Sequence, residues 1–200
     1  ANLGTTTFGS ARIGDLSINT GDPSILLAAA TTGLFRSNDA GVTWTRVLPA
    51  VGSAASLASA VFFDPQKPSV AWAALGTDTG AAANGVYKST DAGKTWAHIG
   101  LEDTRQIGKV AVDPGDPNRV FVAALGHAWG PNPERGVYRS RDGGTSWQLV
   151  LHKSERAGVA DLTMDAANPR VLYAAIWQGR RYPYAASSGG EDSGIWRSLD

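Results

Sequence analysis

The chain has 200 residues, of which 42% are hydrophobic and 18% are charged, so it can bury a substantial core and shows no compositional sign of disorder. Its 18 basic and 18 acidic residues cancel, which excludes a global field that would draw it to nucleic acid or to an anionic membrane surface. Cysteine is absent, which excludes disulfides and thiolate metal sites.

Short segments rich in β-branched or aromatic residues, bounded by Gly, Pro or Asp, recur in the same order along the chain and predict strands. No segment carries a helical apolar period of helical length, so we expect few helices. Four strands are expected in each of three periods and three in a fourth, at residues 13–18, 25–30, 33–36 and 44–48; 58–63, 70–75, 85–88 and 96–99; 107–112, 120–125, 136–140 and 147–151; and 159–164, 171–176 and 195–197.

Two kinds of turn punctuate these strands. Asp-Pro or Asn-Pro pairs follow each first strand, where Pro fixes φ and the polar side chain can bond to the backbone that follows. An octapeptide, Ser-x-Asp-x-Gly-x-Thr/Ser-Trp, follows each third strand, and its serines are spaced by 52, 51 and 58 residues. We expect the octapeptides to be structural turns, in which Asp accepts hydrogen bonds from amides and Trp covers the turn; their residues are Ser37, Asp39, Gly41, Trp44, Ser89, Asp91, Gly93, Trp96, Ser140, Asp142, Gly144 and Trp147, with Ser198 and Asp200 opening a fourth copy.

A repeat of about 50 residues that holds four antiparallel strands predicts an all-β chain with the β-propeller arrangement. About four blades are expected in one segment spanning 1–200, at residues 11–52, 53–103, 104–153 and 154–200. The fourth blade lacks its outer strand in this sequence. One interpretation is that the chain is part of a larger propeller, and another is that residues 5–8 supply the missing strand and close a four-bladed ring.

The octapeptide resembles the Asp-box, or BNR repeat, of sialidases, family 74 xyloglucanases and sortilin-type Vps10 domains. The stretches 107–114, 135–144 and 194–198 are similar to bacterial exported proteins of the sortilin-like and BNR-repeat glycosyl hydrolase-like kinds. The resemblance implies a propeller, but its enzymes and receptors share the repeat. Arg12-Ile13 is followed by Gly14 rather than by the proline of a sialidase, and Thr32 precedes Gly33 where family 74 enzymes carry Asp.

The connection between second and third strands lengthens from period to period, whereas the connection between blades barely changes. Variable loops on a rigid scaffold are where binding chemistry is usually found, so we expect a ligand site on the face opposite the octapeptides. Candidate binding residues are His127, Trp129, Arg180, Arg181, Tyr182 and Tyr184, with Glu102, Asp103 and Arg105 from a connection between blades; Glu134, His152, Lys153, Glu155, Arg156, Glu191 and Asp192 are expected beside them.

Each candidate also has a structural interpretation. Paired arginines can hold a carboxylate, but exposed arginines are commonly solvated or ion-paired. Loop aromatics can stack on a sugar, but they also pin loops to neighbouring blades. The two loop histidines, His127 and His152, lack partners at metal-ligand spacing, so neither a metal nor another cofactor is expected.

The sequence therefore favours a noncatalytic binding module that recognises a peptide, a glycan or a partner protein through its long loops. The alternative is a glycoside hydrolase of sialidase or xyloglucanase type, whose catalytic carboxylates lie partly outside this segment, because no pair can be assigned within it. High Gly, Ala, Ser and Thr contents with only five lysines favour an extracytoplasmic location in a bacterium. No nucleic-acid partner and no membrane span are expected.

Overall fold

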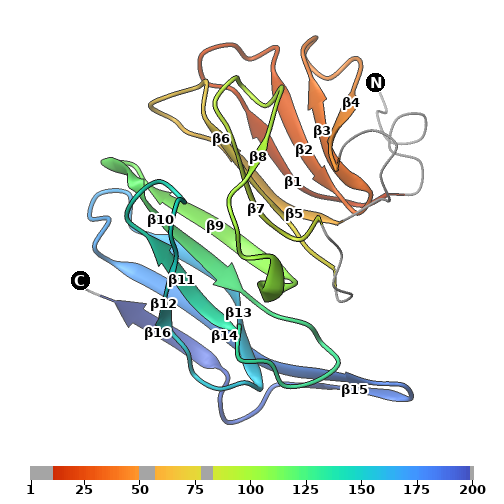
Figure 1. The fold of residues 1–200 in the computed structure, drawn as a ribbon, viewed down its shortest axis with the longest axis vertical. Helices are drawn as coiled ribbons and strands as arrows, with labels where there is room; N and C mark the ends of the chain where they lie inside the picture. The colour runs from red at the N-terminus through yellow and green to blue at the C-terminus, as the bar shows by residue number, and fades with distance from the viewer. Residues whose placement is uncertain (1–10, 50–56, 78–82, 199–200) are drawn as a thin grey trace.

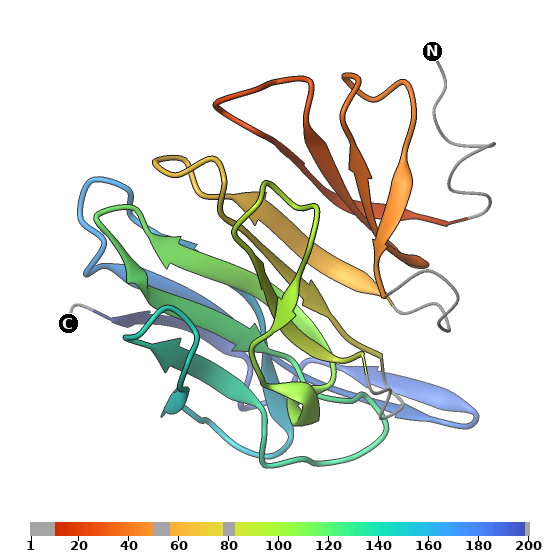
Figure 2. The same ribbon diagram turned by 45° about the horizontal axis from the view of Figure 1, so that its top comes forward.

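The computed structural model describes residues 11–49, 57–77 and 83–198. Within them lie four antiparallel sheets that follow one another along the chain and fan out side by side (Figures 1 and 2). The first sheet contains β1 (Ile13–Ile18), β2 (Leu26–Ala30), β3 (Gly33–Ser37) and β4 (Thr45–Leu48) in sequence order. The second contains β5 (Ala58–Phe63), β6 (Ala71–Leu75), β7 (Gly85–Ser89) and β8 (Ala97–His98), and the third contains β9 (Ile107–Asp113), β10 (Asp116–Ala124), β11 (Gly136–Ser140) and β12 (Gln148–Leu151).

The fourth sheet departs from this pattern. It contains β13 (Ala157–Met164), β14 (Leu172–Tyr182), β15 (Ala185–Ser188) and β16 (Gly194–Ser198), and β14 pairs with all three of the others. The sequence predicts a loop after residue 176, so the extension of β14 and the strand β15 correct that expectation. The proposed closing strand at residues 5–8 lies outside the described residues, as does Asp200.

The sheets pack face to face, which gives the fold its core. Leu27 and Leu34 of the first sheet share a cluster with Val61 and Leu75 of the second. The same arrangement joins the second sheet to the third, and the third to the fourth. Every residue of β6 is buried, as expected for a strand covered on both faces. The described residues therefore form a partial β-propeller of four blades.

The octapeptide turns have one repeated hydrogen-bond pattern. In the second turn, the Ser89 hydroxyl donates to Asp91 at 2.8 Å and accepts from the Gly93 amide at 2.8 Å. The other oxygen of Asp91 accepts from the Thr95 hydroxyl at 2.6 Å, and the Trp96 indole donates to the Gly93 carbonyl at 3.0 Å. The first and third turns repeat the Ser, Asp and Gly contacts.

The octapeptide tryptophans are half-buried, and they differ in the partner of the indole. The indoles of Trp44 and Trp96 donate to the glycine carbonyl of their own turn, whereas the indole of Trp147 donates to the carbonyl of Ile99 in the neighbouring blade at 2.7 Å. The ring of Trp147 still lies beside its own turn, 3.5 Å from the position of a Cβ on Gly144, so it also joins two blades.

Basic side chains that precede the octapeptides also link neighbouring blades. Arg36 donates to the carbonyl of Ala92 at 2.9 Å, and Lys88 donates to the carbonyl of Gly143 at 3.0 Å. In each case a residue just before one turn bonds to the turn of the next blade. The end of the molecule that carries these turns is called the turn face below.

Antiparallel order fixes the position of every connection. The first-to-second and third-to-fourth connections lie on the turn face, and the second-to-third and blade-to-blade connections lie at the opposite end, the loop face. The loop face also carries η1 (Glu102–Thr104), which is the one helical turn among the described residues. The chain's variable connections are therefore gathered on a single face.

Candidate functional site

In each blade with a longer second-to-third loop, the residue before the first glycine of the third strand bonds to the start of the loop. These paired loop ends are called the loop neck below. In blade 2, the amide oxygen of Asn84 accepts from the Thr77 amide at 3.0 Å. In blade 4, the Ser193 hydroxyl accepts from the Gln178 amide at 3.0 Å. In blade 3 this position is Arg135, which is 2% exposed. Loops of different length thus have their two ends held together by hydrogen bonds where they leave the sheet.

Arg135 organises the long loop of blade 3. Its guanidinium donates to the carbonyls of His127 at 2.6 Å, Gly130 at 3.3 Å and Arg156. Burial lowers the pKa of Arg135, and the bonds to carbonyl oxygens compensate the buried charge. Asn132 is also buried, and its side-chain amide donates to the carbonyls of His127 and Gly130. Its backbone N–H donates to the carbonyl of Glu155 at 2.9 Å. The loop is therefore held from inside.

The blade 4 loop is a hairpin that projects beyond the sheets at the loop face (Figure 1). The ring of Trp177 lies over Gly179, where an added Cβ would be 2.2 Å from it, and its indole donates to the Ser188 hydroxyl at 3.0 Å. The amide of Arg181 donates to the carbonyl of Ala128 at 2.7 Å. This bond joins the hairpin to the long loop of blade 3 and brings Trp129 beside it.

Aromatic rings are exposed along this junction. Trp129 is 49% exposed, Tyr182 is 36% exposed and Tyr184 is 89% exposed. The rings of Tyr182 and Tyr184 are stacked, with centroids 6.2 Å apart and an interplanar angle of 25°. The guanidinium carbon of Arg180 lies 4.8 Å from the centroid of the Tyr182 ring. The structure thus groups Arg180, Tyr182 and Tyr184 by direct contact, and it joins their hairpin at Arg181 to the loop that carries His127 and Trp129.

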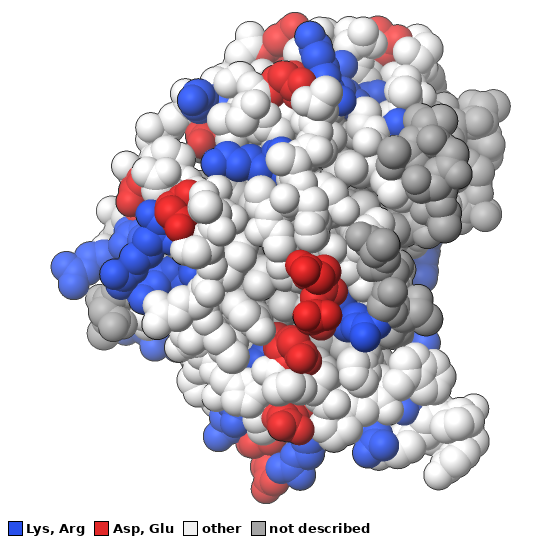
Figure 3. Space-filling model, in the orientation of Figure 1, with Lys and Arg blue, Asp and Glu red and all other residues white. Residues whose placement is uncertain are grey.

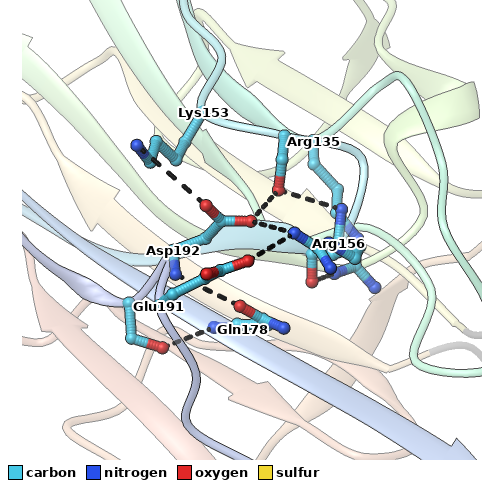
Figure 4. A network of polar contacts seen from close by, with 8 residues as sticks. Arg135, Lys153, Arg156, Gln178, Glu191 and Asp192 are labelled. Atoms are coloured by element: carbon cyan, nitrogen blue, oxygen red, sulfur yellow. Dashed lines mark hydrogen bonds and ion pairs between the residues drawn. The ribbon is translucent and has the colours of Figure 1, made fainter.

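Beneath the hairpin lies an ion-pair network (Figure 4). Arg156 contacts Glu191 at 3.0 Å and Asp192 at 3.3 Å, and Lys153 is 4.0 Å from Asp192. Asp192 also accepts from the Ser154 hydroxyl at 2.7 Å. This hydrogen bond, with the charges of Arg156 and Lys153, lowers the pKa of Asp192 although burial opposes the shift. Both carboxylates are therefore ion-paired with Arg156.

Glu102, Asp103 and Arg105 occupy a different part of the loop face. Glu102 and Asp103 are exposed on η1, at the connection between blades 2 and 3. Burial raises the pKa of Tyr138, and the charges of Glu134 and Asp103 raise it further, so these two acids lie near one ring of blade 3. Glu102, Asp103 and Arg105 therefore lie towards the blade 3 loop, which carries Glu134. That they form one binding rim with the hairpin stays a prediction.

The roles of Arg135, Asn132 and Gly179 depend on contacts made in three dimensions, so sequence reasoning did not select these residues. The one available signal was positional, because Arg135 replaces the small polar residue found before the third-strand glycine in the other blades. Within residues 11–49, 57–77 and 83–198, no three His, Asp or Glu side chains group as metal ligands. No helix in that part of the chain is long and apolar enough to cross a membrane.

No family model matches the chain. Among curated proteins, it is 32% identical over 112 residues to a probable oligoxyloglucan-reducing end-specific xyloglucanase of Neosartorya fischeri, covering 54% of this chain and 12% of that protein. It is 27% identical over 173 residues to a Paenibacillus xyloglucanase, covering 79% of this chain and 15% of that protein. The chain thus spans a small part of the curated relatives it matches.

Solved structures show the same fold. An ancestral GH74 enzyme matches with a TM-score of 0.65 at 21% identity, over 84% of this chain and 22% of that chain. The GH74 enzyme of Niastella koreensis matches with a TM-score of 0.62 at 19% identity, over 92% of this chain and 28% of that chain. YCF48 bound to D1 peptide matches with a TM-score of 0.55 at 17% identity, over 91% and 55% respectively. The described residues thus share the β-propeller fold of these structures, and the chain is similar in sequence to parts of xyloglucanases. Its resemblance to sortilin-type proteins stays a prediction.

Proposed function

We propose that this chain is a noncatalytic, glycan-binding segment of an extracytoplasmic bacterial β-propeller protein. The observation that carries the proposal is the exposure of Trp129, Tyr182 and Tyr184 on two loops that the Arg181–Ala128 hydrogen bond joins. Aromatic side chains combine a large apolar face with a polar edge, which suits the alternating C–H and hydroxyl surfaces of a sugar ring. Anchoring by Arg135 and by the Trp177 indole reduces the entropy lost on binding.

The xyloglucanase relatives favour a glycan over a peptide as the ligand. A peptide is the alternative ligand, because YCF48 has the same fold and is bound to a peptide. Both ligands would use the same loop face. The exposed, stacked rings of Tyr182 and Tyr184 support the glycan, since flat aromatic faces suit sugar rings.

The second candidate function is hydrolysis, favoured by the xyloglucanase relatives. Glycosidases use two carboxyl groups, one of which has a raised pKa so that it can protonate the leaving group. Glu191 and Asp192 share one arginine, and the pKa of Asp192 is lowered. The octapeptide acids have pKa values of about 2 and lie on the turn face. A hydrolase would need its general acid from another part of the protein.

Binding to a panel of soluble polysaccharides, measured by calorimetry, tests the proposal. Replacing Trp129 by alanine is expected to weaken binding about fivefold, and replacing Tyr182 and Tyr184 together about 30-fold, since each sugar stacked on a ring contributes on the order of 1 kcal/mol. The matched control is Tyr173→Ala, because Tyr173 is 37% exposed but lies near the turn-face end of β14. Equal loss in the control, or no binding to any glycan, would refute the proposal.

Release of reducing ends from the same polysaccharides separates the two functions. The binding proposal expects capture without turnover by this segment. Turnover that disappears on Glu191→Gln or Asp192→Asn substitution, with binding retained, would establish the hydrolase instead. Point variants are preferable to deletion of residues 179–188, because deletion would remove the Ser188 partner of Trp177 and expose that ring.

A further inference from the structure

The hairpin of blade 4 carries an uncompensated positive charge. Residues 177–190 include two arginines and no Asp or Glu. Arg156, below the hairpin, pairs with two carboxylates, and Arg119 on the turn face pairs with Asp113. Within the described part of the chain, neither Arg180 nor Arg181 forms an ion pair. Their guanidinium groups are exposed and available to an anion.

The strand geometry places the two arginines on opposite sides of the hairpin. Side chains alternate along β14, so Arg180 shares a side with Tyr182, and Arg181 shares a side with Trp177. Arg180 lies against the ring of Tyr182. A guanidinium near an aromatic face remains charged, and its planar N–H fork matches the two oxygens of a carboxylate. One small anion cannot contact both sides, whereas a polymer with repeated anionic groups can.

The charge of the surrounding face is consistent with this placement. Acidic side chains gather over the region of η1, whereas the coloured side chains beside the hairpin are basic (Figure 3). An anionic ligand would be repelled from the η1 region and attracted to the hairpin. The exposed rings of Tyr182 and Tyr184 add a requirement for flat, partly apolar units in the same ligand.

We propose that the blade 4 hairpin binds a polyuronate, a polysaccharide with a carboxylate on each sugar unit. Sugar rings stack on the exposed ring of Tyr184, and carboxylates of units on the Tyr182 side accept hydrogen bonds from Arg180. Units of the same polymer that pass around the hairpin place their carboxylates against Arg181 on the other side. This inference rests on the proposed function, because it specifies the chemical class of the glycan. A polyuronate differs in charge from xyloglucan, the polymer after which the xyloglucanase relatives are named.

A matched pair of ligands isolates the charge. Polygalacturonate and its fully methyl-esterified form have the same backbone, but the ester lacks the carboxylates. Calorimetry in the presence of EDTA is expected to give at least about tenfold tighter binding of the acid form, and added NaCl should reduce that difference because it screens exposed charges. Arg180→Gln with Arg181→Gln is expected to reduce the affinity for the acid form to that for the ester.

The control variants are Arg141→Gln and Arg170→Gln, which remove the same charge from exposed positions on the turn face. They should leave the preference for the acid form unchanged. Equal binding of acid and ester, or an acid preference that survives loss of both hairpin arginines, overturns the inference while the aromatic variants still test the proposed function. Failure to bind either polymer or any neutral glycan overturns both.

Discussion

Replacing Gly108 by alanine tests how closely the inner strands of neighbouring blades approach. A methyl group on Gly108 in β9 would lie 2.1 Å from the carbonyl oxygen of Ala160 in β13, and 2.7 Å from the carbonyl carbon. Ordinary contact begins at 3.4 Å, so the difference between 3.4 and 2.1 Å requires the two backbones to separate by about 1.3 Å. Because these strands lie beside the core between blades 3 and 4, we expect a loss of about 1–3 kcal/mol in the free energy of unfolding.

Gly14→Ala provides the matched control, since Gly14 is also the second residue of an inner strand. Its added methyl group would be 4.0 Å from its nearest neighbours, the carbonyl oxygens of Ala29 and Ser59. Any effect of alanine on the unfolded chain is common to both variants, so the difference between them reports the clash. Urea unfolding should give a lower midpoint for Gly108→Ala at an unchanged slope, and a midpoint near wild type for Gly14→Ala. Equal midpoints would refute the close approach of β9 and β13.

Three further predictions use the same unfolding assay or hydrogen exchange. The octapeptide aspartates have folded pKa values of about 2, below the ordinary 3.8, so their contribution to stability is present above about pH 4 and is lost as the pH falls toward 2. Replacing Asp39, Asp91 and Asp142 by Asn should flatten the pH dependence of the urea midpoint in that range. An unchanged dependence of the midpoint on pH would count against the turn contacts. Trp72→Ala should cost about 3–5 kcal/mol because Trp72 is fully buried, whereas Trp129→Ala should cost far less, and similar melting shifts would contradict the assigned burial. Arg135→Met should increase hydrogen exchange at residues 127–132, with partial protection restored by Lys; unchanged exchange would show that the guanidinium does not hold the loop.

The repeated features of the fold were predictable from sequence because each depends on local chemistry. The octapeptide brings its donors and acceptors within a few residues, so Ser89, Asp91 and Gly93 specify their turn without help from distant segments. Buried second strands such as β6 are apolar along their length and bounded by turns. The bounds were less predictable where pairing is irregular: β8 contains only Ala97 and His98 in regular register, and Ile99 and Gly100 bond to Val86 of β7 outside that register.

The hairpin could not be predicted from composition. Residues 178–182 are polar and include Gly179, so they lack the apolar alternation of a half-buried strand. Three contacts stabilise this part of the strand. The Trp177 ring occupies the space that a Cβ on Gly179 would fill, and its indole N–H donates to the Ser188 hydroxyl. The backbone N–H of Arg181 donates to Ala128 in the long loop of blade 3. These contacts join segments from two blades. The candidate residues were therefore predictable as a group on one face. Their distribution, with some on the hairpin and others at η1, was not predictable.

Closed loop necks explain how one scaffold can carry such different connections. Thr31 and Thr32 suffice between β2 and β3, whereas Asn84 and Arg135 bond across progressively wider openings. Closing a longer loop costs little additional entropy once its ends are fixed, so length can vary beyond the neck without strain in the sheets. A change in loop composition then alters the ligand surface while the octapeptide turns and inter-blade cores stay the same. We therefore expect the proposed binding to be separable from stability, so that the exposed arginines and tyrosines of the hairpin can be replaced without unfolding the blades.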